Sequence, residues 1–183
     1  ADSLTVAEYL PQGVHVEDIG CGAGFPTLPL AIARPDLFIL ALDSTAKRID
    51  YVAQTAKKLN LARVDAISCR AEDGAAVGNA MRESFDCAIS RAVANLPVLC
   101  ELCLPYVRIG GLFVAMKAAQ AAQEMELARD GIAKLGGRVR DVVSLDLIGE
   151  GGKEERNLIL TEKIEKTPKI YPRKYAQIVK KPL

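Results

Sequence analysis

Three glycines and a preceding acid are the residues of this sequence with the clearest chemical use. Gly20, Gly22 and Gly24 follow an apolar segment and precede Pro26, and Asp18 stands two residues before the first glycine. Glycines allow a sharp turn and let a ligand approach the backbone where a Cβ atom would clash. Proline suits the first turn of a helix because its missing N–H group is not needed there. The spacing therefore predicts a ligand-binding loop between a strand and a helix.

Asp18 favours a positively charged ligand for this loop. In loops that bind dinucleotides the third glycine follows the second by three residues, whereas Gly24 follows Gly22 by two. A carboxylate beside the loop repels a diphosphate, but it attracts an ammonium or sulfonium group. S-adenosylmethionine carries both of these cations, and the backbone amides of a glycine loop can bind its carboxylate. We therefore expect S-adenosylmethionine in preference to NAD.

Further acidic positions indicate a nucleoside. Asp43 ends the second apolar segment, where a carboxylate can accept hydrogen bonds from both ribose hydroxyls. NAD and an adenosyl cofactor would both use such a residue, so Asp43 does not choose between them. Ala71 and Glu72 follow the third apolar segment and are placed to border an adenine. The alternative, a glycine-rich turn with solvated acids, is disfavoured because three strand ends agree.

These residues need a scaffold in which strands and helices alternate. The strands predicted from apolar runs cover residues 14–19, 37–42, 64–68, 86–90 and 112–116. The helices predicted from apolar periodicity cover residues 26–33, 44–59, 96–105 and 120–135. Two closing strands are predicted over residues 139–147 and 158–161, joined by a polar loop over 149–156. This alternation predicts an α/β fold with a mostly parallel seven-stranded sheet and helices on both faces.

Some boundaries of these elements have candidate signals. Ser44 and Asn95 precede predicted helices and are expected to cap them. Gly110 and Gly111 are expected to form the turn that precedes the fifth strand.

Length and composition are typical of one globular domain. The chain has 183 residues, of which 50% are hydrophobic and 26% charged. No run approaches the ~18 apolar residues of a membrane span. The first residues also lack the basic segment followed by an apolar one that marks a secretion signal. We therefore expect a cytoplasmic protein without a membrane partner.

The cysteines and the single histidine are expected to be structural. Most of the five cysteines lie inside apolar segments, which fits a reducing cytoplasm. Cys100 and Cys103 could form half of a metal site, but no second pair or nearby histidine completes a zinc set. Two buried core residues are therefore favoured. Cys87 is expected in the core as well, and His15 is expected to be an ordinary strand residue. We therefore expect no metal.

The charge is distributed unevenly along the chain. Residues 166–183 contain six basic side chains and no acidic one, which leaves residues 1–165 with a net charge of −5. We therefore expect a domain over 1–165 followed by a basic C-terminal tail over 166–183. A basic tail of this kind indicates an anionic partner.

The tail mixes cations with aromatic side chains. The residues concerned are Tyr171, Arg173, Lys174 and Tyr175. Such a mixture binds phosphates and stacks on unpaired bases, so we expect RNA binding here, extended by Arg156 and Lys153 from the preceding polar loop. The alternative is a tail in which Tyr171 and Pro172 fold back on the domain. Both roles can coexist.

Taken together, these segments resemble one family, the bacterial small-subunit ribosomal RNA guanine-N7 methyltransferases, also called glucose-inhibited division protein B. The matching residues are 18–26, 42–44 with Lys47 and Arg48, 70–72, 85–86, 90–94, 110–111, Lys117, 135–137, 167–168, 171–173 and 181–183. The resemblance covers nearly the whole chain and is specific, because methyltransferases in general share only the first two segments.

The sequence departs from the family pattern at a few positions. The family usually has a serine or threonine near Cys21, a glycine near Thr27 and a glycine where Ala118 stands. These small changes are expected to adjust packing without removing the site. Residues 2–4 resemble a point well inside family members, so we expect the family's N-terminal helical segment to be missing.

The resemblance implies a Rossmann-like class I methyltransferase fold and a site for S-adenosylmethionine. It implies cofactor contacts from Gly20, Phe25, Ala71, Glu72 and Arg91, with Asp43 on the ribose. Together with the loop analysis, the expected cofactor-binding residues are Asp18, Gly20, Gly22, Phe25, Asp43, Ala71, Glu72 and Arg91. The expected partner is 16S ribosomal RNA or the small ribosomal subunit, and the chain is expected to act as a monomer.

Methylation of a guanine N7 requires few catalytic groups. The nitrogen carries a free lone pair and no proton, so no general base is needed, and the enzyme mainly aligns the reactants. Arg91 follows the fourth strand, where the transferred methyl group should emerge, and Lys117 ends the fifth. Each is expected to act in catalysis by holding a phosphate, a guanine O6 or the cofactor carboxylate. The alternative for each is an ion pair with a neighbouring acid.

Other functions fit parts of the sequence. A methyltransferase with a small-molecule or protein acceptor keeps the cofactor site, but the basic tail argues against it. A non-catalytic nucleotide-binding module is compatible with a chain that lacks the N-terminal segment. An NAD-dependent oxidoreductase is disfavoured by the glycine spacing and by Asp18.

Overall fold

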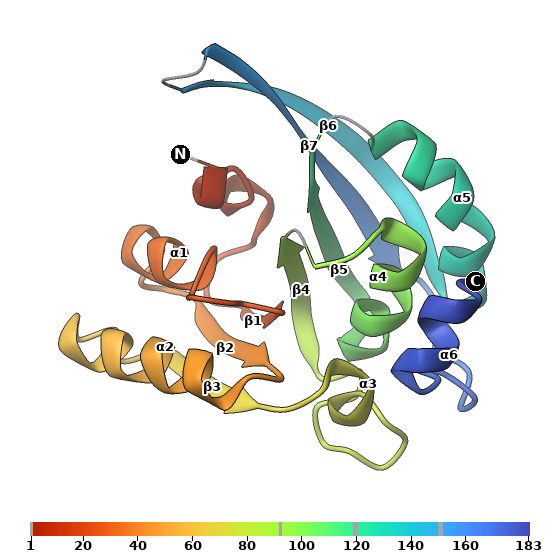
Figure 1. The fold of residues 1–183 in the computed structure, drawn as a ribbon, viewed down its shortest axis with the longest axis horizontal. Helices are drawn as coiled ribbons and strands as arrows, with labels where there is room; N and C mark the ends of the chain where they lie inside the picture. The colour runs from red at the N-terminus through yellow and green to blue at the C-terminus, as the bar shows by residue number, and fades with distance from the viewer. Residues whose placement is uncertain (1, 92, 119–120, 150–151) are drawn as a thin grey trace.

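The structure, a computed structural model, describes residues 2–91, 93–118, 121–149 and 152–183 of the chain (Figure 1). Its strands are β1 (His15–Ile19), β2 (Phe38–Asp43), β3 (Val64–Ser68), β4 (Phe85–Arg91), β5 (Val107–Lys117), β6 (Gly137–Gly149) and β7 (Gly152–Lys163). Its α-helices are α1 (Thr27–Ala33), α2 (Ala46–Lys58), α3 (Ala71–Gly74), α4 (Leu96–Cys103), α5 (Ala121–Lys134) and α6 (Tyr175–Lys180). Short 3₁₀ helices are η1 (Asp2–Leu4), η2 (Ala7–Tyr9) and η3 (Leu104–Tyr106).

The described strands form a single seven-stranded sheet with the order β3-β2-β1-β4-β5-β7-β6. β1 pairs in parallel with β2 and β4, and β5 pairs in parallel with β4. β7 runs antiparallel to both β5 and β6. The predicted mostly parallel seven-stranded sheet is therefore confirmed. The strand order reverses between β1 and β4, and ligands of such sheets bind outside the carboxyl ends of the strands at this point.

Helices cover both faces of the sheet, as predicted (Figure 1). On one face, Leu30 of α1 clusters with Ile39 of β2, and Val52 of α2 clusters with Ala41. On the other face, α4 and α5 pack over a cluster that includes Phe113 of β5. Among the described residues, no helix is both long and apolar enough to cross a membrane.

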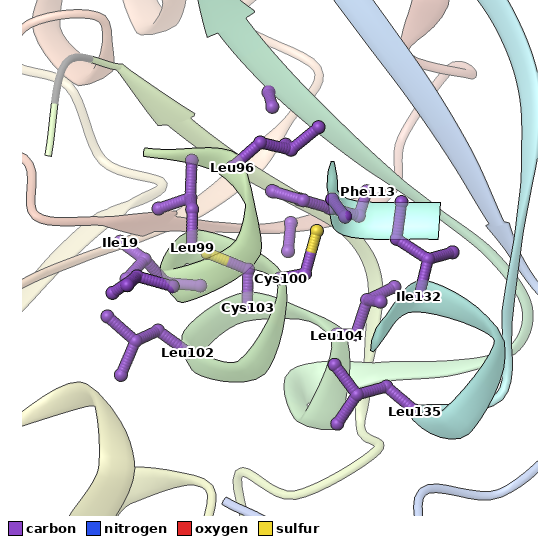
Figure 2. Packing of buried hydrophobic residues seen from close by; sticks show 14 of the residues in the cluster. Ile19, Leu96, Leu99, Cys100, Leu102, Cys103, Leu104, Phe113, Ile132 and Leu135 are labelled. Atoms are coloured by element: carbon purple, nitrogen blue, oxygen red, sulfur yellow. The ribbon is translucent and has the colours of Figure 1, made fainter. Parts of the chain in front are cut away.

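Helix α4 is buried along its whole length. Every residue from Leu96 to Cys103 is buried, and Figure 2 shows Cys100 and Cys103 among the leucines of α4, with Cys100 on the side of Ile132 in α5. A helix surrounded by apolar neighbours belongs to a core. Burial also raises the pKa of the Cys103 thiol well above its ordinary value, which leaves it unreactive. The expectation that these cysteines are core residues is confirmed.

The predicted cap at Ser44 is wrong. Helix α2 begins at Ala46, and its cap residue, Thr45, makes no side-chain capping hydrogen bond. Instead, Oδ1 of Asp43 accepts a hydrogen bond of 2.8 Å from the backbone N–H of Thr45. Asp43 thus fixes the residue that precedes α2 and leaves the first turn of the helix without a side-chain cap. The predicted cap at Asn95 is confirmed, because its Oδ1 accepts a hydrogen bond of 3.2 Å from Val98 N.

Two predicted boundaries on the β5–β7 side differ from the structure. Gly110 and Gly111 lie within the bounds of β5, but Phe85 of β4 pairs with Val107 and Cys87 pairs with Leu112, so residues 108–111 form a bulge in which Gly110 has a φ angle of +80°. The turn expected at these glycines is therefore a bulge inside the strand, and a Cβ atom on Gly111 would lie 2.5 Å from the carbonyl oxygen of Asp86. Within the polar segment predicted as a loop over 149–156, Gly149 pairs with Gly152, and residues 153–156 of β7 pair with residues 145–148 of β6. Residues 150 and 151 lie outside the described part of the chain. The β7 residues from Gly152 to Glu155 are exposed, so no apolar alternation marks them as a strand.

Candidate functional site

A cavity of about 670 Å³ opens at the carboxyl ends of β1, β2, β3 and β4. Seven of the eight residues expected to bind the cofactor line it, namely Gly20, Gly22, Phe25, Asp43, Ala71, Glu72 and Arg91. The eighth, Asp18, does not. The parallel sheet explains the convergence, because each of these residues ends a strand or lies in the segment that follows one, and the carboxyl ends of these strands meet at one edge.

The glycine loop is shaped for a ligand. Gly20 and Gly22 have φ angles of +74° and +56°, a left-handed region that glycine enters without strain. A Cβ atom on Gly20 would clash with the side chain of Val93, whereas a Cβ atom on Gly22 would meet nothing within 4 Å. Gly22 thus faces open space on the cavity side of the loop, as a backbone that receives a ligand requires.

Asp43 connects the loop to the ribose side of the cavity. Its Oδ2 accepts a hydrogen bond of 3.1 Å from Gly22 N and lies 3.4 Å from the guanidinium of Arg48. Burial alone would raise the pKa of this carboxyl, but the hydrogen bonds from Thr45 and Gly22 hold it below its ordinary value. Asp43 is therefore ionised at neutral pH and can accept hydrogen bonds from ligand hydroxyls.

Asp18, which was expected to contact the ligand, does not line the cavity. The side chain is fully buried below the loop, where its Oδ2 accepts hydrogen bonds of 3.2 Å from Thr27 N and 2.5 Å from Thr27 Oγ1. Burial raises the pKa of Asp18 to about 6, although the hydrogen bonds from Thr27 and the charge of Arg91 oppose the shift. Asp18 therefore holds the start of α1 in place. Its Oδ1 has no hydrogen-bond partner among the described residues.

Arg91 stands at the boundary of two cavities. It lines the large cavity and also a second one of about 260 Å³ that lies beyond the ends of β4 and β5. Its guanidinium lies 5.7 Å from the ring centroid of Phe25 and pairs with Asp2 at 3.1 Å. The ion pair weighed as an alternative for Arg91 therefore exists, and the side chain still borders the cofactor cavity.

The second cavity gathers three of the expected cations, Arg91, Lys117 and Arg156. Nζ of Lys117 donates a hydrogen bond of 2.7 Å to the carbonyl oxygen of Ala94 and pairs with Glu124 at 2.7 Å. Nε of Arg156 pairs with Asp2 at 3.3 Å. Asp2 and the buried Asn157 also line this cavity. The sequence did not indicate either residue, because neither stands at the end of a predicted strand.

The remaining RNA-binding candidates lie elsewhere. Arg173 pairs with Glu101 of α4 at 2.6 Å, and Lys174 pairs with Asp73 of α3 at 3.2 Å. The guanidinium of Arg173 also lies 5.9 Å from the ring centroid of Tyr171. The structure therefore places Tyr171, Arg173 and Lys174 beside α3 and α4, apart from Arg156. One lining residue of the large cavity that the sequence did not single out as a cofactor contact, Tyr175, comes from this same tail.

The large cavity fits an adenosyl cofactor. An ionised carboxylate at Asp43 suits a ribose, the backbone at Gly22 is open to a ligand, and the apolar side chains of Leu42, Val93 and Leu102 suit an adenine or a thioether chain.

Comparison with known proteins points to one family. The sequence model described as "GidB: rRNA small subunit methyltransferase G" matches residues 1–158. A Brevibacillus brevis protein named ribosomal RNA small subunit methyltransferase G is 46% identical over 185 residues, which cover 100% of this chain and 76% of that protein. A Clostridium perfringens protein of the same name is 44% identical over 177 residues, which cover 97% of this chain and 73% of that protein.

The solved structures with a similar fold share little sequence with this chain, and they include several methyltransferases and a cyclase, SpnF. A geranyl diphosphate C-methyltransferase from Streptomyces coelicolor, solved with S-adenosyl-L-homocysteine, matches with a TM-score of 0.65 at 14% identity, covering 88% of this chain and 78% of that one. A SAM-dependent O-methyltransferase from Thermotoga maritima matches with a TM-score of 0.64 at 15% identity, covering 91% and 66%. At these identities the likeness shows the fold, which is the Rossmann-like class I methyltransferase fold.

Proposed function

Because this chain belongs to the GidB family, rRNA small subunit methyltransferase G, we propose that it transfers the methyl group of S-adenosylmethionine to N7 of a guanine in 16S ribosomal RNA. The observation that carries the proposal is the 670 Å³ cavity, which gathers seven predicted cofactor-binding residues at the strand-order reversal. The acceptor follows from the family and from the cations that border the second cavity.

The chain's own residues bind and orient the cofactor. Asp43 accepts hydrogen bonds from the ribose hydroxyls, Ala71 and Glu72 border the adenine, and the backbone of the glycine loop receives the methionine carboxylate. Phe25 and Arg91 close the cavity on the side of the second cavity. When bound, the cofactor supplies a methyl group that its sulfonium has already activated.

The acceptor base enters from the second cavity. Arg91 and Lys117 border it and carry donors that suit a guanine O6 or a phosphate. Guanine N7 has a free lone pair, so these residues need only orient the base and stabilise its charge. Alignment of this kind supplies about 7–11 kcal/mol of barrier reduction in favourable cases.

The RNA-binding surface combines two parts of the chain. Arg156 contacts the RNA beside the second cavity, and Tyr171, Arg173 and Lys174 extend the contact along the tail. Lys174 is largely exposed and can bind a phosphate directly. Arg173 already pairs with Glu101, so any phosphate must share its guanidinium with that carboxylate. We also propose that the protein acts as a monomer in the cytoplasm, where ribosomal RNA is found.

Calorimetry tests the cofactor. We expect the protein to bind S-adenosylmethionine and its product S-adenosylhomocysteine and not to bind NAD. Binding of NAD alone would overturn the proposal.

Transfer of a labelled methyl group tests the acceptor. We expect label in 16S ribosomal RNA, offered naked and within the small subunit, and release of 7-methylguanine on hydrolysis. Label in protein but not in RNA would favour another acceptor, and cofactor binding without any transfer would favour a non-catalytic module.

A further inference from the structure

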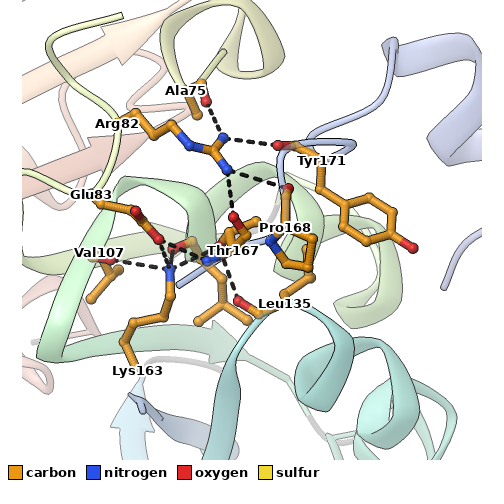
Figure 3. A network of polar contacts seen from close by, with 10 residues as sticks. Ala75, Arg82, Glu83, Val107, Leu135, Lys163, Thr167, Pro168 and Tyr171 are labelled. Carbon is orange, nitrogen blue, oxygen red and sulfur yellow. Dashed lines mark hydrogen bonds and ion pairs between the residues drawn. The ribbon is translucent and has the colours of Figure 1, made fainter. Parts of the chain in front are cut away.

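The C-terminal tail is fixed to the domain by a buried polar network, which Figure 3 shows. The side chain of Lys163, at the end of β7, is fully buried. Its Nζ donates hydrogen bonds of 2.8 Å to Leu104 O, 3.2 Å to Val107 O and 2.8 Å to Thr167 Oγ1. The backbone N–H of Thr167 donates a hydrogen bond of 2.7 Å to Glu83. Because buried polar groups need such partners, the start of the tail has one defined position.

Arg82 joins the tail to the region that follows α3. Its guanidinium donates hydrogen bonds of 2.8 Å to the carbonyl oxygens of Ala75, Thr167 and Tyr171, and one of 3.4 Å to that of Pro168 (Figure 3). Ala75 directly follows α3, whose first residues, Ala71 and Glu72, line the large cavity. The same side chain therefore holds the tail and this wall of the cavity together.

A second contact fixes the tail just before α6. Glu101 of α4 has no exposed surface, and its carboxylate accepts hydrogen bonds from the backbone N–H of Arg173 (2.8 Å) and from the guanidinium atoms Nε and Nη2 (2.9 and 2.6 Å). Two-pronged pairing between an arginine and a carboxylate fixes orientation as well as distance. Ile178 of α6 is fully buried in the core cluster on this face. The tail is therefore part of the folded domain.

These contacts place Tyr175 on the wall of the large cavity. The residue begins α6, is 42% exposed, and lines the cavity together with Cys69, Ala71, Glu72 and Leu102. Cys69, Ala71 and Glu72 follow β3, where the adenine is expected. The ion pair between Lys174 and Asp73 holds the residue before Tyr175 beside the residue after Glu72. An aromatic ring at this position can cover one side of a purine, which gains free energy by contact with a ring.

We propose that Tyr175 is a cofactor-binding residue that packs against the adenosine end of S-adenosylmethionine, and that Arg173 and Glu101 position it. The inference rests on the proposed function, because it takes the ligand to be an adenosyl compound. It also assigns the tail a role in cofactor binding in addition to any contact with RNA. The basic tail would then contact the cofactor through Tyr175 and the RNA through its cationic residues.

Calorimetry with S-adenosylhomocysteine, in the absence of RNA, tests Tyr175. We expect Tyr175→Ala to weaken binding about tenfold, within the range that stacking of a base on an aromatic side chain provides. Tyr175→Phe keeps the ring and should recover most of the affinity. Tyr51→Ala is the matched control, because Tyr51 is a comparably exposed tyrosine on α2 that does not line the cavity.

The outcomes separate the inference from the proposed function. If the wild-type protein binds S-adenosylhomocysteine and Tyr175→Ala binds it equally well, the role of Tyr175 is overturned and the proposed function stands. If the wild-type protein fails to bind it, the proposed function itself fails and the inference with it.

Trypsin provides a readout that does not depend on affinity alone, because the tail offers cleavage sites at Arg173, Lys174 and Lys180. At saturating S-adenosylhomocysteine we expect slower cleavage of the tail in the wild type and in Tyr51→Ala. At the same degree of saturation, Tyr175→Ala should show little protection. Equal protection of wild type and Tyr175→Ala would contradict the proposed contact.

Discussion

Asp18 and Glu17 are neighbours on β1 whose side chains point to opposite faces of the sheet. Both carboxyl groups are fully buried, so neither is solvated as a surface acid would be. Asp18 binds Thr27. Both carboxylate oxygens of Glu17 lie buried without a hydrogen-bond partner among the described residues. Burial, and to a lesser extent the charge of Asp18, raises the pKa of Glu17 well above its ordinary value. Glu17 is therefore protonated in the folded protein at pH values where it is ionised in the unfolded chain.

This difference predicts how stability depends on pH. The folded state binds a proton at Glu17 that the unfolded state has lost above about pH 4.3, so the free energy of unfolding falls as the pH rises from there toward the folded-state pKa. Glu17→Gln removes this loss. In urea unfolding at pH 5 and pH 8, we expect a smaller decrease in stability for Glu17→Gln than for the wild type. Asp18, with a pKa of about 6, contributes equally to both proteins, and identical decreases would contradict the prediction.

Asp43 supports a prediction on cofactor affinity. Asp43→Asn keeps the shape of the side chain and removes its charge, and hydrogen bonds to a charged group contribute about 1.5–3 kcal/mol each. We expect at least tenfold weaker binding of S-adenosylhomocysteine by calorimetry. Because Asp43 also holds Gly22 and Thr45, thermal unfolding must show that the variant is folded. Asp50→Asn on α2, outside the cavity lining, is the control that should bind normally.

At the scale of elements, the sequence predicts the strands whose ends form the site better than it predicts the β5–β7 side of the sheet. The apolar runs locate β2 and β4 inside the sheet, because parallel strands buried on both faces read as nearly continuous apolar segments. β3 is also located, although it is an edge strand without a buried residue. The strand ends then locate Gly20, Asp43 and Ala71. The exposed start of β7, from Gly152 to Glu155, escapes this reasoning because an exposed ribbon leaves no apolar pattern.

The two predicted helix caps differ in the structure, and this difference can be measured as a change in stability. Asn95 accepts a hydrogen bond from Val98 N, whereas Ser44, predicted as a cap on the same grounds, has no such role. We expect Asn95→Ala to lower the free energy of unfolding by about 1 kcal/mol and Ser44→Ala to leave it nearly unchanged. If urea denaturation showed equal decreases in the free energy of unfolding for the two variants, Ser44 would stabilise α2 as Asn95 stabilises α4, and the prediction would be wrong.

At the scale of the whole molecule, the C-terminal tail packs against the rest of the domain through Ile178 and Arg173. Composition alone indicates a basic appendage, and the charge count gives no sign of Glu101, the buried acid that Arg173 pairs with. That contact joins residues 72 positions apart, so no local pattern could have predicted it. The tail's aromatic and cationic residues are therefore divided between packing, the cofactor cavity and the exposed surface, although the sequence presents them as one group.

This division predicts opposite behaviour for two adjacent cations. Arg173→Ala leaves Glu101 buried without its partner, which typically lowers stability by about 3–5 kcal/mol, and should be largely rescued when Glu101→Leu is added. Lys174→Ala breaks only an exposed pair with Asp73, so its stability should change by less than about 1 kcal/mol.

If Lys174 binds an RNA phosphate, the salt dependence of RNA affinity should lose about one ionic contact in Lys174→Ala. Chemical denaturation and filter binding across a salt series test both residues. A stable Arg173→Ala variant with only a reduced salt dependence would return Arg173 to the role of a simple phosphate contact.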